Sequence, residues 1–352
     1  SFNIGVFYVH KIEDTRIPKI VLSARTSESN MKNNVAPDIA NSFNFFQMVY
    51  GKLPEYQSFN ATEIPLSHGE AFPGLIHLSY QTFETNLEDG SHEIFRAHEV
   101  AHQWWGIGVD FKTYHDQWIS EGFSSFSGLW YMQLIMKDND KFINALKRYK
   151  RQIQEEKLDL KSGSKLPPIS LGHRASTSET GNDYSSITYR KGAFVLHMLR
   201  MMMIDYKTFN EDRFTNMMKE FFNTYKGKRA STADFKQIVS KHAGEDMSWF
   251  FNQWVDGSEI PNYTWAYKSQ STPDGYDVQI KVKQDDVPDN FKMIIPIQVN
   301  FGQDRFYRTK ILVDKKINEI ALPYLPLEPE SIEFNIYEAV LCEHDEDDWD
   351  DF

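Results

Sequence analysis

Apolar residues recur at helical spacing through most of the first 260 residues of the chain. This pattern predicts helices over Val35 to Val49, Ile94 to Trp105, Trp118 to about Lys137, Lys141 to Glu156, Ser186 to Ile204, Glu211 to Tyr225, Thr232 to His242 and Asp246 to Val255. Strand-like sequence precedes them at Ile4 to Val9 and Lys19 to Ala24. The Gly, Ser and Pro residues of Leu158 to Gly181 predict a loop.

The pattern changes after Pro261, where strand-like runs replace helical ones. From Tyr263 to Ala339 these runs, such as residues 276–282 and 295–299, are separated by turn residues, which is typical of a small antiparallel β-sandwich. Pro296 has no N–H to donate, so its run is expected at a sheet edge or at a strand start. The fold class predicted for the chain is therefore α+β.

Two histidines four residues apart, His98 and His102, fall in one of the predicted helices. A helix turns about 100° per residue, so both imidazoles project from one face and can reach a single zinc ion. Glu99 lies beside that face, where its carboxylate can take a proton from the attacking water and pass it to a leaving amine. Two solvated or core histidines also produce this spacing by chance, so the context decides the interpretation.

The context supplies a third ligand. Glu121 follows His102 after eighteen intervening residues, on the next predicted helix, and a carboxylate completes the two-His-one-Glu set of catalytic zinc sites. Ser125 and Gly128 continue the stripe that Glu121 begins, and small residues there would let the two helices approach closely. We therefore predict one zinc ion per chain, held by His98, His102 and Glu121.

Four motifs resemble the gluzincin metallopeptidases, the family that includes membrane alanyl aminopeptidase (aminopeptidase N) and leukotriene A hydrolase. They are HEVAHQWWG from His98, WISEGF around Glu121, DYSSITYRKGAFVLHML from Asp183 and WFFNQWVDG from Trp249, and together they span about 160 residues. The resemblance implies a thermolysin-like catalytic domain. It also implies that Tyr189 donates a hydrogen bond to the oxyanion of the reaction, a role that suits a phenol. Tyr184 matches a second tyrosine of the leukotriene hydrolase branch.

One motif departs from this family, whose members carry Gly-Ala-Met-Glu-Asn before a Gly-Leu-Ile strand and bind the substrate's α-amino group with that Glu. Alignment on Gly74 places the family's Glu at Ala71, one position after Glu70. Neighbouring strand residues face opposite sides, so Glu70 could replace the anchor only through a bulge or slip. Glu70, Ala71, Gly74 and Tyr184 are candidate substrate-binding residues. The resemblance also implies that the strand 75–78 edges the cleft, where an extended peptide can add to the sheet.

Composition narrows the function classes. The net charge of −12 argues against nucleic acid as a partner, and no run of 18 apolar residues offers a membrane span. The one cysteine, Cys342, excludes an internal disulfide but fits a cytoplasmic and a bacterial extracytoplasmic protein equally, so localisation stays open. The last ten residues hold seven acidic side chains and no basic one, which predicts a disordered acidic tail.

These patterns divide the chain into four expected parts. Residues 1–30 are interpreted as a strand remnant of the N-terminal β domain that the resemblance implies and that is otherwise missing here. Residues 31–260 are expected to be the catalytic domain, 261–340 the β-sandwich and 341–352 the acidic tail.

The predicted function is zinc-dependent hydrolysis of peptide bonds, as in an aminopeptidase, with Glu99 as base and then acid. An endopeptidase or another amide hydrolase is the alternative that Ala71 favours. A peptide-binding protein on a catalytically inactive peptidase fold is a third possibility, although all four residues of the zinc site and its base are present. The partners expected are peptide substrates; the oligomeric state stays open.

Overall fold

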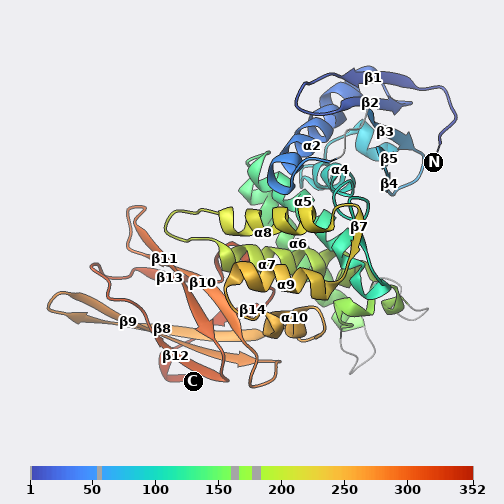
Figure 1. Ribbon diagram of the computed structural model, residues 1–352. Helices are drawn as coiled ribbons and strands as arrows, with labels where there is room; N and C mark the ends of the chain where they lie inside the picture. The colour runs from blue at the N-terminus through green and yellow to red at the C-terminus, as the bar shows by residue number, and fades with distance from the viewer. Residues whose placement is uncertain (1, 54–57, 160–165, 177–183, 352) are drawn as a thin grey trace.

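A mixed five-stranded sheet opens the computed structural model, which describes residues 2–53, 58–159, 166–176 and 184–351 (Figure 1). Its strand order is β1 (Tyr8–Ile12), β2 (Lys19–Ala24), β3 (Ser58–Ile64), β5 (Leu75–Ser79) and β4 (Glu70–Phe72). β2, β3 and β5 run parallel, whereas β1 and β4 are antiparallel to their neighbours. Between β2 and β3 the chain forms α1 (Glu28–Asn30), the π-helical segment η1 (Met31–Val35) and α2 (Ala36–Tyr50).

This sheet corrects two expectations. β1 and β2, interpreted as a remnant of a separate domain, belong to the same sheet as β3, because β1 pairs with β2 and β2 pairs with β3; Ile20 and Leu22 of β2 are fully buried in the common core. The sheet edge beyond β5 is formed by β4, because β5 is paired on both sides. The strand 75–78 is therefore an inner strand, and β4 with Glu70 and Ala71 is the edge strand.

Helices that cover this sheet and continue below it make up the middle of the chain (Figure 1). They are α3 (Tyr80–Glu84), α4 (Ser91–Ala101), η2 (Tyr114–Asp116), α5 (Trp118–Leu134), α6 (Asn139–Asp159), η3 (Ile169–Ala175), η4 (Ser185–Lys191), α7 (Gly192–Met203), α8 (Asp212–Tyr225), α9 (Thr232–Ala243) and α10 (Ser248–Trp254); β6 (Val109–Phe111) pairs in parallel with β7 (Lys228–Ala230).

The helices lie close to the ranges that apolar spacing predicts, with three differences. α4 ends at Ala101, before the expected Trp105, because the chain turns at His102. The helix expected from Ser186 begins as the π-helical η4. In the expected loop 158–181, residues 166–176 contain η3, whereas 160–165 and 177–181 lie outside the described residues.

Two sheets form the C-terminal part of the chain. One has the order β12 (Ile317–Ala321), β9 (Gly275–Asp285), β8 (Asn262–Thr272) and β14 (Glu343–Glu346); the other has the order β11 (Phe306–Val313), β10 (Met293–Asn300) and β13 (Ser331–Phe334), which the 3-10 turn η5 (Ile336–Glu338) follows. The ring of Trp265 in β8 stacks on Phe334 of β13 at 5.3 Å, so the sheets meet through apolar faces. The molecule is thus a mixed α and β structure.

Pro296 lies in a central strand, β10, rather than in an edge strand. Pairing of β10 with β13 begins only at Ile297, so Pro296 lies beyond the end of that neighbour. The missing N–H is tolerated there because β13 does not reach it.

The acidic C-terminal segment is ordered, contrary to the expectation of a disordered tail. Residues 343–346 form β14, which pairs in parallel with β8, and the 3-10 turn η6 (Trp349–Asp351) follows. Glu343 accepts a hydrogen bond from Gln154 of α6 and lies 3.5 Å from the Lys150 ammonium. Backbone pairing and this cation offset the repulsion that the acidic composition suggests.

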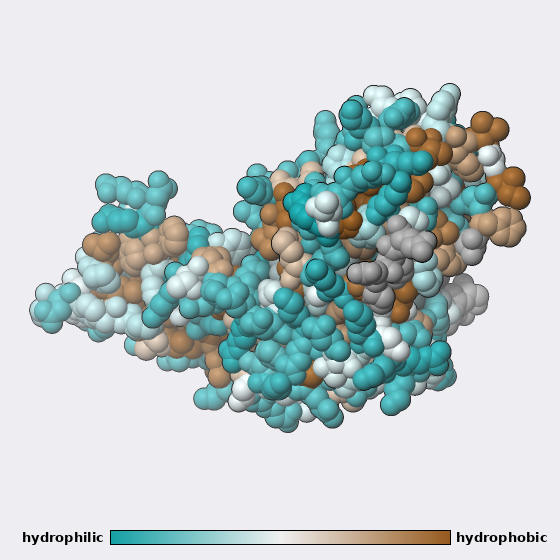
Figure 2. Space-filling view, turned by 45° about the horizontal axis from the view of Figure 1, so that its top comes forward, coloured by the Kyte–Doolittle hydropathy of each residue, from teal (hydrophilic) through white to brown (hydrophobic). Residues whose placement is uncertain are grey.

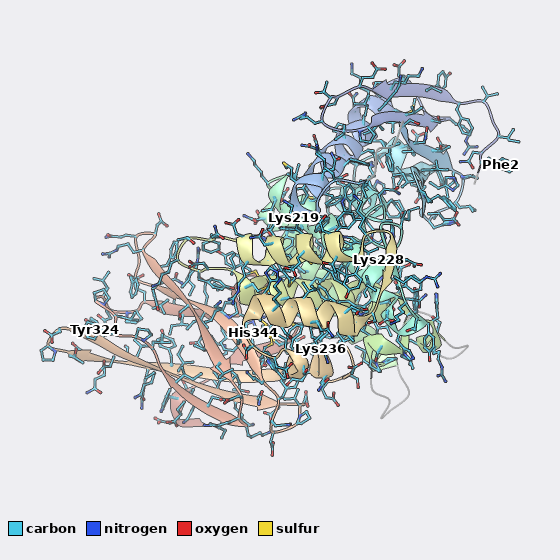
Figure 3. The ribbon with its side chains drawn as sticks, viewed as in Figure 1. Phe2, Lys219, Lys228, Lys236, Tyr324 and His344 are labelled. Atoms are coloured by element: carbon cyan, nitrogen blue, oxygen red, sulfur yellow. The ribbon has the colours of Figure 1, made fainter. Side chains whose placement is uncertain are left out.

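Phe2 and Tyr324 mark opposite ends of the molecule (Figure 3). Exposed apolar side chains gather at the Phe2 end, where Ile4 and Val6 are at least 90% exposed, and apolar surface is visible there in Figure 2. Within the described part of the chain, every helix is too short or too polar to cross a membrane.

Candidate active site

Small residues bring α4, α5 and η4 together. A Cβ added to Gly128 of α5 would lie 2.6 Å from the backbone oxygen of Ile94 in α4, so the two helices touch at this glycine. Gly122 makes a similar contact with Gly192, at the junction of η4 and α7. The expectation that small residues allow close helix approach is confirmed, and this contact sets how far Glu121 lies from the histidines.

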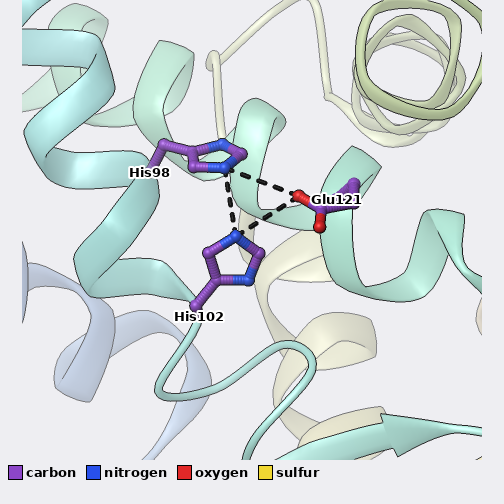
Figure 4. A group of neighbouring side chains, drawn as sticks. All are labelled: His98, His102 and Glu121. Carbon is purple, nitrogen blue, oxygen red and sulfur yellow. Dashed lines mark hydrogen bonds and ion pairs between the residues drawn. The ribbon is translucent and has the colours of Figure 1, made fainter. Parts of the chain in front are cut away.

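Three ligand atoms converge between α4 and α5 (Figure 4). His98 Nε2 lies 3.1 Å from His102 Nε2, and Glu121 Oε2 lies 3.6 and 3.3 Å from these two nitrogens. Atoms that bind one tetrahedral zinc at 2.0–2.2 Å are separated by about 3.3–3.5 Å. The residues thus fit a single metal ion. Among the described residues, this is the only such group of three His, Cys, Asp or Glu side chains.

The second nitrogen of each histidine is held by the protein. His102 Nδ1 lies 3.0 Å from the Trp105 carbonyl, which can only accept, so Nδ1 donates and Nε2 presents its lone pair. Ser124 Oγ also lies 3.1 Å from this Nδ1, and Ser125 Oγ lies 3.3 Å from His98 Nδ1. Such partners fix the ring orientation of metal-binding histidines. The helical spacing reveals the ligands but not which serines face them.

The electrostatics of the group favour a cation. Glu121 Oε2 is buried and accepts no hydrogen bond from the described residues. Burial is the largest single effect and opposes charge on His102, but the carboxylates of Glu121 and Glu99 and the Trp105 carbonyl together raise the His102 pKa to about 9. Burial lowers the pKa of His98, so that ring tends to stay neutral. A buried carboxylate beside two nitrogen donors is a site where a divalent ion would replace a proton.

Glu99 lines the same cleft from α4 and is 4% exposed. Burial raises the pKa of its carboxyl to about 8, with a smaller contribution from the negative charges of Glu121 and Glu70. Gly69 packs directly on it, because a Cβ at that position would lie 2.2 Å from Glu99 Oε1. The chain just before β4 therefore approaches the carboxyl as closely as only a glycine allows.

Tyr189 of η4 also lines the cleft, with its ring stacked on His98 at 6.0 Å and 11°. Burial raises its pKa, so the phenol keeps its proton and remains a donor. Tyr184 contacts Tyr189 edge-on at 5.8 Å and stacks on His173 at 4.3 Å. Burial and, to a smaller extent, the charge of Glu121 raise the pKa of Tyr184, so its phenol lies near the same group of residues.

The candidate anchor residues separate into two groups. Glu70 and Ala71 both line the cleft, and β4 pairs regularly with β5, without a bulge. The half-exposed Glu70 carboxylate lies 3.6 Å from His68 Nε2 and 3.5 Å from His77 Nδ1. Gly74 lies instead in the β4–β5 turn, with a φ of +72° that only glycine adopts easily.

Gln103 is a site residue that the sequence patterns do not reveal. Its side-chain oxygen accepts from the Gly74 N–H at 2.9 Å, and its amide donates to the Phe72 carbonyl at 3.0 Å. Gln103 follows His102 directly, so it fastens the β4–β5 turn to the end of the histidine helix. The only available signal was its place within the HEVAHQWWG motif.

The cleft that these residues share has a volume of about 960 Å³, within the range of small-molecule and peptide sites. β4 and the segment before it, α4 and α5, and α6 and η4 all contribute to its lining. The arrangement can place a carbonyl group against a metal ion, with an acid–base carboxyl and a phenol donor beside it.

The chain is similar to known peptidases over this region. Residues 80–254 match the Peptidase family M1 domain. Two proteins of Sulfurisphaera tokodaii match as well: "Probable aminopeptidase 2" is 28% identical over 60% of this chain and 22% of its own length, and "Probable aminopeptidase 1" is 24% identical over 74% and 33%. The glutamyl aminopeptidase of Rattus norvegicus is 26% identical over 50% of this chain and 18% of its own length. The chain thus matches a third or less of the length of these relatives.

The fold agrees with a solved structure. The crystal structure of Legionella pneumophila aminopeptidase A in complex with aspartic acid aligns with 97% of this chain and 38% of its own chain, with a TM-score of 0.71 and 15% identity. At this identity the similarity concerns the fold alone.

Proposed function

The chain belongs to peptidase family M1, and from this premise we propose that it is a zinc-dependent metallopeptidase that hydrolyses peptide bonds, as an aminopeptidase. The observation that carries the proposal is the convergence of His98, His102 and Glu121 at separations of 3.1–3.6 Å. These three residues would hold one zinc ion. When bound, zinc polarises a carbonyl group and lowers the pKa of water.

The residues around the ion divide the remaining chemistry. Glu99 takes a proton from the attacking water and then delivers it to the leaving amine. The phenol of Tyr189 donates a hydrogen bond to the carbonyl oxygen of the substrate as negative charge develops on it. Tyr184 and Gln103 keep Tyr189 and the β4–β5 turn in position. Glu99 is nearly fully buried, which keeps bulk water from competing for its proton.

Recognition of the substrate's amino end rests on β4. Glu70 is the carboxylate of this strand that lines the cleft, and the regular β4–β5 pairing shows that it does so without a bulge. We propose Glu70 as the group that pairs with the free ammonium. The second candidate function, an endopeptidase, is favoured by Ala71, which stands where the family carries its anchoring Glu.

We also propose a division of the chain into two domains. Residues 31–260 would form a thermolysin-like domain that also includes β1 and β2, and residues 261–346 a β-sandwich. The ring contact between Trp265 and Phe334 supports the sandwich, since it joins one sheet to the other.

The test combines metal analysis with hydrolysis. Elemental analysis should find one zinc per chain, and chelation should abolish cleavage of alanine p-nitroanilide. Glu99→Gln should keep the zinc and the fold but lose activity, because the amide has the same shape and cannot accept the proton.

Two results would reject the proposal. One is zinc-loaded protein that cleaves neither free nor N-acetylated peptide substrates. The other is a Glu99→Gln variant as active as the parent. Preference for the N-acetylated substrates would instead select the endopeptidase.

A further inference from the structure

Two arginines line the cleft, and both lie outside β4 and the zinc-site helices α4 and α5. Arg148 comes from α6, and Tyr149 and Gln152 line the cleft beside it, since positions i, i+1 and i+4 share one side of a helix. Arg190 comes from η4, directly after Tyr189. Neither arginine is needed for the metal site or for the proton transfer proposed above.

In the part of the chain that the structure describes, Arg190 has only a hydroxyl as its hydrogen-bond partner. Its Nη1 donates to Ser186 Oγ at 2.9 Å, and among the described residues no Asp or Glu lies within ion-pair distance of its guanidinium. Its side chain is partly buried at the cleft wall. Partial burial removes part of the water around this cation, and no negative charge among the described residues compensates for that loss of solvation.

Arg148 forms an ion pair with a residue that does not itself line the cleft. Its Nη1 lies 2.6 Å from Oδ2 of Asp89, whose side chain is 48% exposed. A guanidinium carries five N–H donors, so this single contact leaves most of them available. The remaining donors belong to a side chain that lines the cleft.

Both arginines lie near the same phenol. Burial raises the pKa of Tyr149, and the positive charges of Arg190 and Arg148 oppose this rise. Both guanidinium groups thus lie within electrostatic range of one hydroxyl, on a single cleft that both side chains line. Their mutual repulsion is relieved when an anion sits between them.

We propose that Arg148 and Arg190 form a carboxylate-binding subsite of the cleft, with Tyr149 and Gln152 as neutral donors. The inference rests on the proposed peptidase function. Planar guanidinium groups bind carboxylates with two parallel hydrogen bonds, which suits a ligand group of this shape. The ligand is the free C-terminal carboxylate of a short peptide or the side chain of an Asp or Glu residue in it.

Binding to matched peptides tests the subsite independently of turnover. The zinc-loaded Glu99→Gln protein is titrated calorimetrically with Ala-Ala-Ala and its C-terminal amide. A second arm uses tripeptide amides with Asp or Asn in the first or second position. In at least one pair the acid should bind about 10-fold more tightly, which corresponds to about 1.4 kcal/mol. The pair that differs identifies the source of the carboxylate.

Variants assign the effect to the two arginines. Arg190→Gln and Arg148→Gln should each reduce the preference, and together they should bring it within about 2-fold, while binding of the neutral peptide stays unchanged. Arg190→Lys should retain part of it, because the charge remains without the planar fork. Arg151→Gln is the matched control, since Arg151 lies exposed on α6 and does not line the cleft.

The outcomes separate this inference from the proposed function. Equal binding of acid and neutral peptides, no measurable binding of any acid peptide, or a preference that survives the double variant would overturn the subsite. Failure of the zinc-loaded parent to cleave the neutral peptides would reject the peptidase function alone, because the binding preference is measured without turnover.

Discussion

Replacing Gly128 with alanine tests whether helix spacing holds the metal site together. The added Cβ would lie 2.6 Å from the Ile94 backbone oxygen and 3.1 Å from its Cγ2, whereas ordinary contact begins at 3.4 Å. α4 and α5 must therefore separate by about 0.8 Å at this point, since a backbone oxygen in a helix cannot swing away. Glu121 lies two turns earlier on α5, so part of this displacement reaches the metal ligand.

Two opposing energies decide the sign of the stability change. Alanine improves helix propensity over glycine by about 1 kcal/mol. Forcing a methyl group into a packed helix interface costs about 1–3 kcal/mol, and contact with backbone belongs at the upper end of that range. We expect a net loss of about 2 kcal/mol in the free energy of unfolding. Zinc affinity should fall about 10-fold, as for other changes that displace ligand support.

Urea unfolding and a zinc competition titration measure the two effects. Unfolding of chelated protein reports the sum of the packing cost and the helix-propensity gain, and unfolding with zinc adds the metal contribution. Gly192→Ala is the matched comparison, because its Cβ meets Gly122 Cα at 3.0 Å and its other contacts lie at 3.6 Å or more. That variant should stay within about 1 kcal/mol of the parent.

A Gly128→Ala variant that is as stable as the parent, or more stable, would show that helix propensity outweighs the contact with Ile94. A variant that loses stability but keeps its zinc affinity would show that helix spacing is uncoupled from the metal site.

Three further predictions concern the cleft. Tyr189→Phe should lower kcat by ~10²–10³ with little change in KM or zinc content, as expected for one oxyanion donor, and unchanged turnover would reject that role. Glu70→Ala should remove the preference for an amino-acid amide over its acetylated twin, measured as kcat/KM, whereas Ala71→Glu should add little; a preference that survives Glu70→Ala means that the ammonium binds elsewhere. Gln103→Ala should raise KM more than it lowers kcat, because the loss of two hydrogen bonds loosens β4, and steady-state kinetics with an unchanged KM would contradict this.

The metal site could be predicted from the sequence because its geometry is local. His98 and His102 share a helix face at any position in a fold, and Glu121 lies near the start of the next helix. The close helix contact was also foreseeable, since Gly128 has no side chain. The Nδ1 partners were not: Ser124 and Ser125 are neighbours in sequence, and only the packing of α5 against α4 shows that each faces a different histidine.

The order of the strands in the sheet could not be predicted from the sequence, for a physical reason. The apolar sequence of β5 indicates a strand but carries no information on which strand pairs with its outer side. β4 is three residues long, too short to produce a recognisable pattern, yet it forms the sheet edge at the cleft. β14 was missed for the opposite reason, because its acidic composition hides backbone pairing that depends on the distant β8.

The charges in the cleft suggest how a substrate lies in it. Glu70 is near enough to Glu99 to raise its pKa, so the negative charge of β4 lies on that side of the metal site. Arg190 follows Tyr189, whose ring stacks on His98, and its side chain lines the same cleft. A short peptide is itself a dipole, with an ammonium at one end and a carboxylate at the other. If Glu70 receives the ammonium and the arginines the carboxylate, both ends of a short peptide are bound within the one cleft that Glu99 and Tyr189 also line, so the proposed chemistry takes place on a substrate held at both of its charges.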